Sequence, residues 1–312
     1  MKKIYHVCLS AGDSGLFCRA EEDFKYLVNC IGLSAYSTES ILLSYAVMSN
    51  HVHCCVRTSD VYAFIKNWRY SYTRYFNRKY CRSGRLGNDP FILELKGLHH
   101  ILTAIAYVLR NPLHHGVSAT PFGYRYSSVN AVFRKELGRQ DVVLLPEKSM
   151  YRHLPDSVVP PTDYKMDTSG LFLPECLIDV GDVEHMFATA RTYLYYMNRL
   201  SGKKWEEEQL TDDSSCAPIN IANIEQGVQM NDLRVMIANE FGRSDYNVMT
   251  DSELCKIIDT DYLPEYNAGS VYMMAADKRL QLADRLRFSL HLPVAKICRC
   301  LALPVRKEVD PE

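Results

Sequence analysis

The sequence lacks the features that mark membrane-spanning and exported proteins. Its 312 residues hold no apolar run of roughly 18 residues, the length that a membrane-spanning helix requires. The first residues include two lysines but no apolar stretch of signal-peptide length. The 11 cysteines are odd in number and contain no Cys-x-x-Cys pair. We therefore expect reduced thiols in a cytoplasmic protein that has no membrane partner.

Internal repeats and low-complexity segments are also absent. With 47% hydrophobic and 23% charged residues, the composition is that of a globular protein and excludes a disordered chain. The length favours two domains. Prolines and a polar stretch between residues 146 and 170 are typical of a linker. We expect one domain over residues 1–155 and a helical, all-α domain over residues 156–312.

The small net charge of −1 conceals two halves of opposite sign. Residues 1–155 carry 20 Lys and Arg against 11 Asp and Glu, whereas residues 156–312 carry 16 against 26. A basic half joined to an acidic half indicates that only the first half is suited to a polyanion.

The first half mixes strand and helix patterns. Short apolar runs predict strands at residues 4–9, 41–48 and 51–56, and helical spacing predicts helices at residues 21–33, 61–80 and 98–111. This order favours an α+β sandwich with helices on one face of an antiparallel sheet. In the second half, Thr250 and Glu253 form a predicted capping box, and two short helices are expected on either side of Pro293.

The strand at residues 51–56 carries the motif His51-Val52-His53. Side chains alternate along a strand, so both imidazoles point to one face, about 6–7 Å apart, and can converge on one divalent ion. Cys55 lies on the same face, but the chain has no second Cys/His cluster at zinc spacing. A His-x-His pair also occurs by chance, so the motif alone does not distinguish a metal ligand from a core histidine.

The predicted helix at residues 98–111 places Tyr107 and Asn111 one turn apart on one face. Pro112 disfavours helical geometry at the residue before it, so the helix should end at Asn111. Without further information, the spacing favours a structural role, with Tyr107 as a half-buried helix residue and Asn111 as a C-terminal cap.

Residues 61–88 contain no acidic residue. Aromatic residues are interleaved there with seven basic ones, and such segments bind phosphates through the cations and unpaired bases through the rings. The alternative is a solvated basic helix face. The seven candidate DNA contacts are Lys66, Arg69, Arg74, Arg78, Lys79, Arg82 and Arg85.

These motifs follow one another in an order that resembles the REP-associated tyrosine transposases, a family of the HUH single-tyrosine transposase superfamily. The resemblance covers roughly residues 1–135. It rests on Tyr5-His6-Val7, Met48-Ser49-Asn50-His51-Val52-His53, Tyr75-Phe76-Asn77-Arg78, Ser83-Gly84-Arg85-Leu86, Tyr107-Val108-Leu109-Arg110-Asn111-Pro112 and Tyr124-Arg125-Tyr126-Ser127-Ser128.

The resemblance implies a ferredoxin-like antiparallel sheet that nicks and rejoins single-stranded or hairpin DNA through a 5′-phosphotyrosine. It implies His51, His53 and Asn111 as ligands of Mg²⁺ or Mn²⁺, and Tyr107 as the nucleophile. The basic segment would contact the hairpin, and a homodimer is one possible assembly. The chain departs from the family pattern at Ser49, where proline is usual, and at His114 and His115, where an arginine is common.

Two other functions compete with this interpretation. A domesticated, catalytically silent protein would bind structured single strands without cutting them. A metal phosphoesterase would use water and form no protein–DNA adduct.

Overall fold

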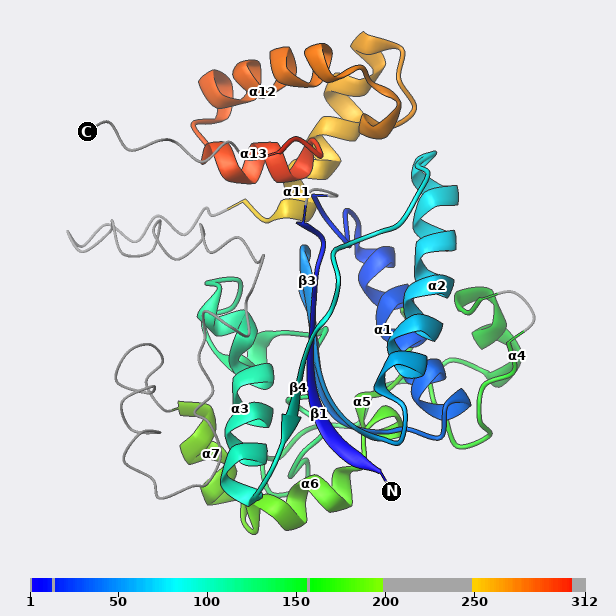
Figure 1. The fold of residues 1–312 in the computed structure, drawn as a ribbon, viewed down its shortest axis with the longest axis vertical. Helices are drawn as coiled ribbons and strands as arrows, with labels where there is room; N and C mark the ends of the chain where they lie inside the picture. The colour runs from blue at the N-terminus through cyan, green and yellow to red at the C-terminus, as the bar shows by residue number, and fades with distance from the viewer. Residues whose placement is uncertain (1, 13–14, 156–157, 199–248, 305–312) are drawn as a thin grey trace, which may run out of the picture.

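A computed structural model describes residues 2–12, 15–155, 158–198 and 249–304 (Figure 1). Its centre is a four-stranded antiparallel sheet with the strand order β2-β3-β1-β4. The strands are β1 (Lys3–Ser10), β2 (Ile41–Val47), β3 (His51–Thr58) and β4 (Phe91–Leu95). The α+β class predicted from the sequence is confirmed.

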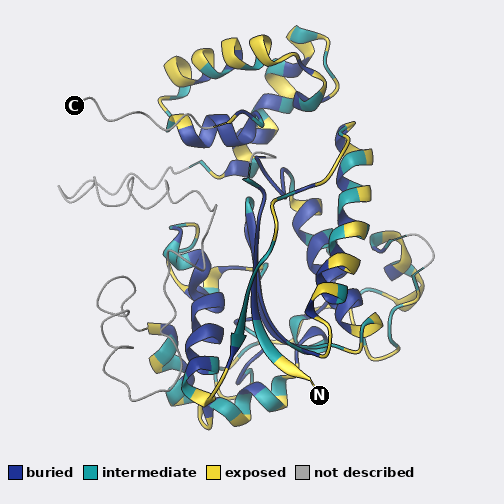
Figure 2. Ribbon diagram, viewed as in Figure 1, coloured by how far each residue is buried: buried dark blue, intermediate teal, exposed yellow. Residues whose placement is uncertain are grey.

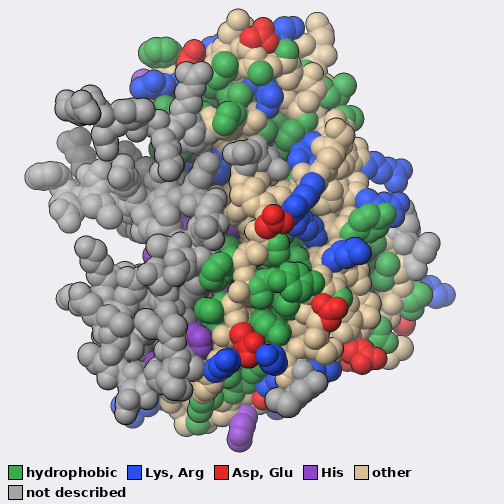
Figure 3. All heavy atoms as spheres, viewed as in Figure 1, with side chains coloured by type: hydrophobic (Ala, Val, Ile, Leu, Met, Phe, Trp, Pro, Cys, Tyr) green, Lys and Arg blue, Asp and Glu red, His purple; other side chains and the backbone are tan. Residues whose placement is uncertain are grey.

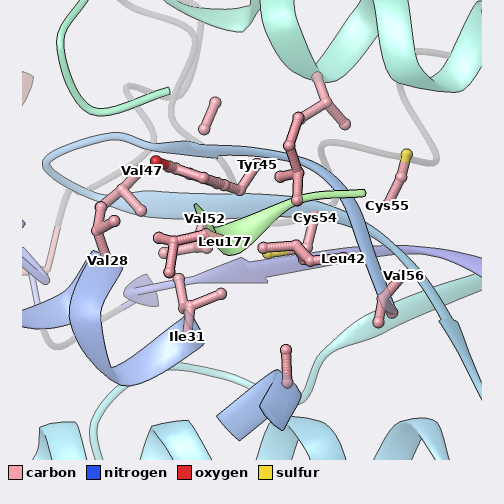
Figure 4. Close-up of a cluster of buried hydrophobic side chains, with 14 of the residues drawn as sticks. Val28, Ile31, Leu42, Tyr45, Val47, Val52, Cys54, Cys55, Val56 and Leu177 are labelled. Carbon is pink, nitrogen blue, oxygen red and sulfur yellow. The ribbon is translucent and has the colours of Figure 1, made fainter. Parts of the chain in front are cut away.

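The alternation of side chains gives this sheet one apolar and one polar face. Leu9 pairs with Val52, and Val7 pairs with Cys54, so these four side chains share a face. Val28 and Ile31 of α1 (Glu21–Ser37) lie against it (Figure 4). Burial of this face is a main source of stability, at about 25 cal/mol for each Å² of apolar surface.

Helices cover both faces of the sheet, so the prediction that they lie on one face is wrong. α1 and α2 (Val61–Tyr80) cover the apolar face, and α3 (Leu98–His114) covers the opposite one (Figure 1). α2 has the bounds predicted from its spacing. Asp60 caps it by accepting a hydrogen bond from the Ala63 amide at 2.9 Å.

α3 continues past its predicted end at Asn111. Pro112 lies in the last helical turn, and the His115 amide still donates to the Asn111 carbonyl at 3.0 Å. A proline removes one amide donor from the helix, and near a helix end that loss disturbs little of the remaining hydrogen bonding. Asn111 therefore stays helical and keeps its side chain on the sheet side.

β4 has no counterpart among the sequence predictions. It is only five residues long, mostly half-buried, and carries Glu94 within an otherwise apolar segment. Its place at the sheet edge next to β1 is marked by the ion pair between Lys3 and Glu94 at 2.9 Å.

The first hydrophobic core extends beyond residue 155. One cluster of buried apolar side chains runs from Val7 on β1 to Met197 on α7, so the predicted boundary falls inside it. Ile178 bridges to Leu42 at the edge of β2, and the Tyr193 hydroxyl donates to the Val129 carbonyl at 2.7 Å. The remaining elements here are η2 (Pro121–Gly123), α4 (Glu147–Met150), η3 (Tyr151–His153), α5 (Pro174–Leu177), α6 (Val180–Phe187) and α7 (Ala190–Asn198).

Residues 249–304 form a second, helical unit with its own core. The capping box of Thr250 and Glu253 is confirmed, as are the two helices flanking Pro293. This C-terminal unit comprises α11 (Asp251–Ile257), a π-helical turn η4 (Ile258–Tyr262), η5 (Leu263–Tyr266), η6 (Val271–Met273), α12 (Ala276–Leu290) and α13 (Val294–Cys300).

Arg19 fastens the C-terminal unit to the loop that precedes α1. It is only 2% exposed and donates to the Cys300 carbonyl at 2.6 Å and to Asp259 at 2.7 Å. Its guanidinium also lies 5.6 Å from the ring centre of Tyr80 and 5.8 Å from that of Tyr272. Figure 2 shows α13, the helix facing the sheet, as largely buried and α12 as largely exposed.

Two further observations concern membrane-spanning helices and the cysteines. Among the described residues, no helix combines the length and the apolar character needed to cross a membrane. The ten cysteines in the described ranges are free thiols.

Replacing Arg19 with alanine should destabilise the attachment of the C-terminal unit. The change removes two charge-assisted hydrogen bonds, while Asp259, at 36% side-chain exposure, can be solvated by water. We expect the free energy of unfolding to fall by about 1–3 kcal/mol, measured by urea denaturation, and α11–α13 to become more sensitive to protease.

Arg285→Ala provides the matched control. Its ion pair with Glu265 is half-exposed on both sides, and such pairs contribute little to stability. Equal losses for the two variants would contradict the role assigned to Arg19.

Candidate active site

The polar face of the sheet carries three histidines. β1 contributes His6 and β3 contributes His51 and His53, and the pairing of Cys8 with His53 places all three side chains on one face. Their side chains are at most 1% exposed. The alternation predicted for His51 and His53 is thus observed, and His6 joins them from the neighbouring strand.

α3 brings Tyr107 and Asn111 onto this face. The Asn111 Oδ1 atom lies 2.7 Å from His51 Nε2. The ring centre of Tyr107 lies 5.5 Å from that of His53 and 6.1 Å from that of His6, both in edge-to-face geometry. The four residues predicted for metal binding and nucleophilic attack therefore meet at one place.

Two more histidines complete a group that we call the histidine cluster: His6, His51, His53, His114 and His115. The His115 ring lies 4.6 Å from the His51 ring, and the His114 ring lies 6.3 Å from the Tyr107 ring. Sequence reasoning did not assign His6 or the His114-His115 pair to the site. In the sequence, their signals were the place of His6 within the predicted strand at residues 4–9 and the His114-His115 pair that follows Asn111-Pro112-Leu113.

Both ring nitrogens of His51 face a side-chain oxygen. Its Nδ1 lies 2.8 Å from Asn50 Oδ1, and its Nε2 lies 2.7 Å from Asn111 Oδ1. When the ring proton is on Nδ1 and is donated to Asn50, Nε2 is a lone pair directed at the Asn111 oxygen. Asn111 Nδ2 has no hydrogen-bond partner in the described part of the chain.

Both ring nitrogens of His53 also have polar neighbours. Its Nδ1 lies 3.1 Å from His6 Nε2, and its Nε2 lies 3.8 Å from Cys8 Sγ. If His53 donates from Nδ1 to His6, its Nε2 is also a lone pair. Metal-binding histidines commonly hold their other ring nitrogen in such a hydrogen bond, which fixes the tautomer.

Burial keeps His53 and His6 neutral. Removal from water, followed by the charges of His51, His6, His115 and His114, holds the pKa of His53 well below its ordinary value. Burial, with a smaller contribution from His100, lowers the pKa of His6 to about 3. Neutral imidazole is the form that binds a metal ion.

The donor set fits a divalent ion of the Mg²⁺ or Mn²⁺ kind. Two imidazole nitrogens and one carboxamide oxygen suit Mn²⁺ at least as well as Mg²⁺. Within the described ranges, no three His, Cys, Asp or Glu side chains are arranged to hold a metal. The candidate site therefore depends on Asn111 as its third donor.

Tyr107 is nearly enclosed, with 7% of its surface exposed. A phenol in this position is largely shielded from bulk water.

The seven basic candidates of α2 and the following loop divide into two groups. Four have partners within the protein: Arg69 donates to the Leu86 and Gly87 carbonyls, Arg82 to the Gly84 and Arg85 carbonyls, Lys79 pairs with Asp23, and Arg85 pairs with Asp89. Lys66, Arg74 and Arg78 are exposed and form no ion pair with any described residue. Lys and Arg side chains gather over α2 (Figure 3).

The loop after α2 reaches the end of the sheet that carries His51. The Asn88 amide donates to the Ser10 carbonyl at 2.9 Å, and Ser10 pairs with His51 across the sheet. α2 lies on the opposite face of the sheet from α3 (Figure 1), so the basic residues of α2 and the histidine cluster are on different sides of the sheet.

Comparisons with known proteins add little to this geometry. No family model matches the chain, and no curated protein matches it. One solved structure that matches is that of a REP-associated tyrosine transposase bound to a REP hairpin. The identity is 13%, the match covers 45% of this chain and 82% of the other, and the TM-score is 0.36. A likeness this weak carries no argument.

Exposed basic residues and those bonded within the protein should respond differently to replacement by alanine. Lys66→Ala and Arg78→Ala should each weaken binding of single-stranded DNA and reduce the slope of log affinity against log salt by about 0.7, without a change in stability. Fluorescence anisotropy at several salt concentrations measures both quantities.

Arg69→Ala serves as the contrasting variant. It should lower stability because the Leu86 and Gly87 carbonyls lose their donor, while the salt slope changes little. The same salt slope for all three variants and wild type would refute the assignment of Lys66 and Arg78.

Proposed function

We propose that this protein nicks and rejoins single-stranded DNA next to a hairpin, through a 5′-phosphotyrosine on Tyr107. One observation carries the proposal. A phenol and a carboxamide from one helix turn meet two imidazoles from one strand, in the order and spacing that the single-tyrosine transposases use. The partner is single-stranded or hairpin DNA, and the cofactor is Mg²⁺ or Mn²⁺ held by His51, His53 and Asn111.

The topology of the sheet supports the proposal. The strand order β2-β3-β1-β4 with antiparallel pairing is that of a ferredoxin-like sheet, and α3 lies on its histidine-bearing face. The C-terminal unit is then an all-α accessory part attached to this catalytic sheet.

The chemistry follows from the residues at the site. The bound ion would reduce the negative charge on the scissile phosphate and orient it. Tyr107 attacks the phosphorus, a P–O bond to tyrosine forms, and the bond to the 3′ oxygen breaks. The proton lost by the phenol is balanced by the proton gained by the 3′ oxygen. The phosphotyrosine keeps the energy of the broken bond, so a second 3′ hydroxyl can reverse the step and join strands.

His6 and Asn50 act as positioning residues in this scheme. His6 Nε2 lies 3.1 Å from His53 Nδ1, and Asn50 Oδ1 lies 2.8 Å from His51 Nδ1. In the proposed scheme each accepts the Nδ1 proton of its imidazole, so that both Nε2 atoms are lone pairs. A tautomer fixed in this way costs no rearrangement when the ion binds.

A catalytically silent, domesticated DNA-binding protein is the second candidate. The enclosure of Tyr107 favours it, because a 7% exposed phenol is not presented to a polymer. The two functions differ in whether a covalent protein–DNA species forms.

Tyr107→Phe tests the nucleophile. The variant should form no covalent adduct with a hairpin-bearing oligonucleotide in Mn²⁺, since it has no phenolic oxygen, yet it should bind the DNA as wild type does. A denaturing gel reports the adduct. Tyr70→Phe, at an exposed position on α2, is the control and should keep it. An adduct on the Tyr107→Phe protein would remove Tyr107 from the mechanism.

Replacement of the ligands tests the metal site. His51→Ala, His53→Ala and Asn111→Ala should each weaken Mn²⁺ binding by at least about tenfold, and His6→Leu by about 10–100-fold through the lost Nδ1 partner. Calorimetric titration of Mn²⁺ into the full chain measures this directly. His185→Ala, exposed on α6, should leave the affinity unchanged.

A further inference from the structure

A pocket lies between the first core and the C-terminal unit, beside the histidine cluster. Its volume is about 350 Å³. It is lined from the first core by Phe24, Tyr126 and His115, and from the C-terminal unit by Asp251, Ser252 and Lys296. His115 belongs to both the pocket and the histidine cluster, and its ring lies 4.6 Å from the ring of His51.

The lining of this pocket suits a flat, uncharged ring. Phe24 and Tyr126 stack on each other at 4.6 Å, with an angle of 20° between their rings. Apolar and aromatic walls with a few polar groups are typical of small-molecule sites, and this volume is at the small end of their range. A single nucleoside fits it, whereas a duplex stem does not.

The acidic side chains of the pocket lining are paired with basic ones. Asp251 is 7% exposed and forms a two-point ion pair with Arg299, at 3.0 and 2.9 Å. It also accepts a hydrogen bond from the Ser49 hydroxyl at 2.6 Å. Burial alone would raise the pKa of Asp251, but Arg299 and Ser49 lower it, so the group is a carboxylate. Glu21, the other acidic residue of the lining, pairs with Lys25 at 2.8 Å, and Lys296 adds a positive charge that donates to the Met249 carbonyl.

We propose that this pocket binds one unpaired nucleobase of the strand that Tyr107 attacks. The inference rests on the proposed function and deepens it. Aromatic side chains hold the base by stacking, and the polar groups of α11 and α13 read its edge. The C-terminal unit thereby becomes a specificity element for the nucleotide next to the cleavage site. Residues 249–304 carry seven Lys and Arg against seven Asp and Glu, so the unit has no net charge that would repel the strand.

The test uses a hairpin-forming oligonucleotide with a single 2-aminopurine at successive positions of its two flanks. The full chain is mixed with each probe in EDTA, so no cleavage occurs. Stacking quenches 2-aminopurine fluorescence, so one position, or two neighbouring ones, should be quenched by the wild-type protein. Ser252→Leu fills the pocket from α11 and should restore that fluorescence and reduce affinity about tenfold.

Lys256→Leu is the matched control, because Lys256 is exposed on the same helix and does not line the pocket. It should leave the quenched position unchanged. Quenching that is identical in wild type and Ser252→Leu, with the oligonucleotide bound, would overturn the base pocket while leaving the nicking proposal standing. Failure of every probe to bind, read by anisotropy, would overturn both.

Discussion

The site depends on the burial of a polar sheet face beneath a helix. A strand that carries His51 and His53 on one side cannot bury that side unless each imidazole finds a partner. His6 and Asn50 satisfy one nitrogen of each ring, and Asn111 on α3 approaches the other nitrogen of His51. The need for these partners fixes the position of α3 against the sheet, and Tyr107, one turn before Asn111, is fixed with it.

The C-terminal unit is a second constraint on the same region. Arg19, buried and bonded to Asp259 and Cys300, joins the loop before α1 to this unit. Ser49, in the turn that leads into His51, bonds to Asp251 at the start of α11. The turn before the histidines and the loop before α1 are therefore both bonded to the C-terminal unit, which lies beside this end of the sheet.

Local periodicity accounts for the elements that the sequence predicted well. β1, β3 and α2 have clear alternation or helical spacing, and Asp60 marks the start of α2. β4 was missed because a five-residue edge strand with one charged residue has too few positions to show alternation. The preference of the residue before a proline for extended geometry predicts an end at Asn111, but α3 runs to His114 because its packing on the sheet outweighs that preference.

For the basic segment at residues 61–88, the sequence likewise could not predict which side chains have partners within the protein. Its seven cations are equivalent in the sequence, but Arg69 and Arg82 bond to carbonyls of the loop that follows α2, and Lys79 bonds to the buried Asp23. A loop carbonyl close in space satisfies a guanidinium as well as a phosphate does, and composition cannot distinguish the two.

By itself, the sequence determined which side chains share a face: two imidazoles two residues apart on a strand, and a phenol and a carboxamide four residues apart on a helix. These relations follow from backbone geometry within one element. Only the tertiary structure decided that the strand face and the helix face meet, that His6 and His115 join them, and that a second core stands beside them. Contacts between distant segments depend on how whole surfaces pack, and no short stretch of sequence contains that information.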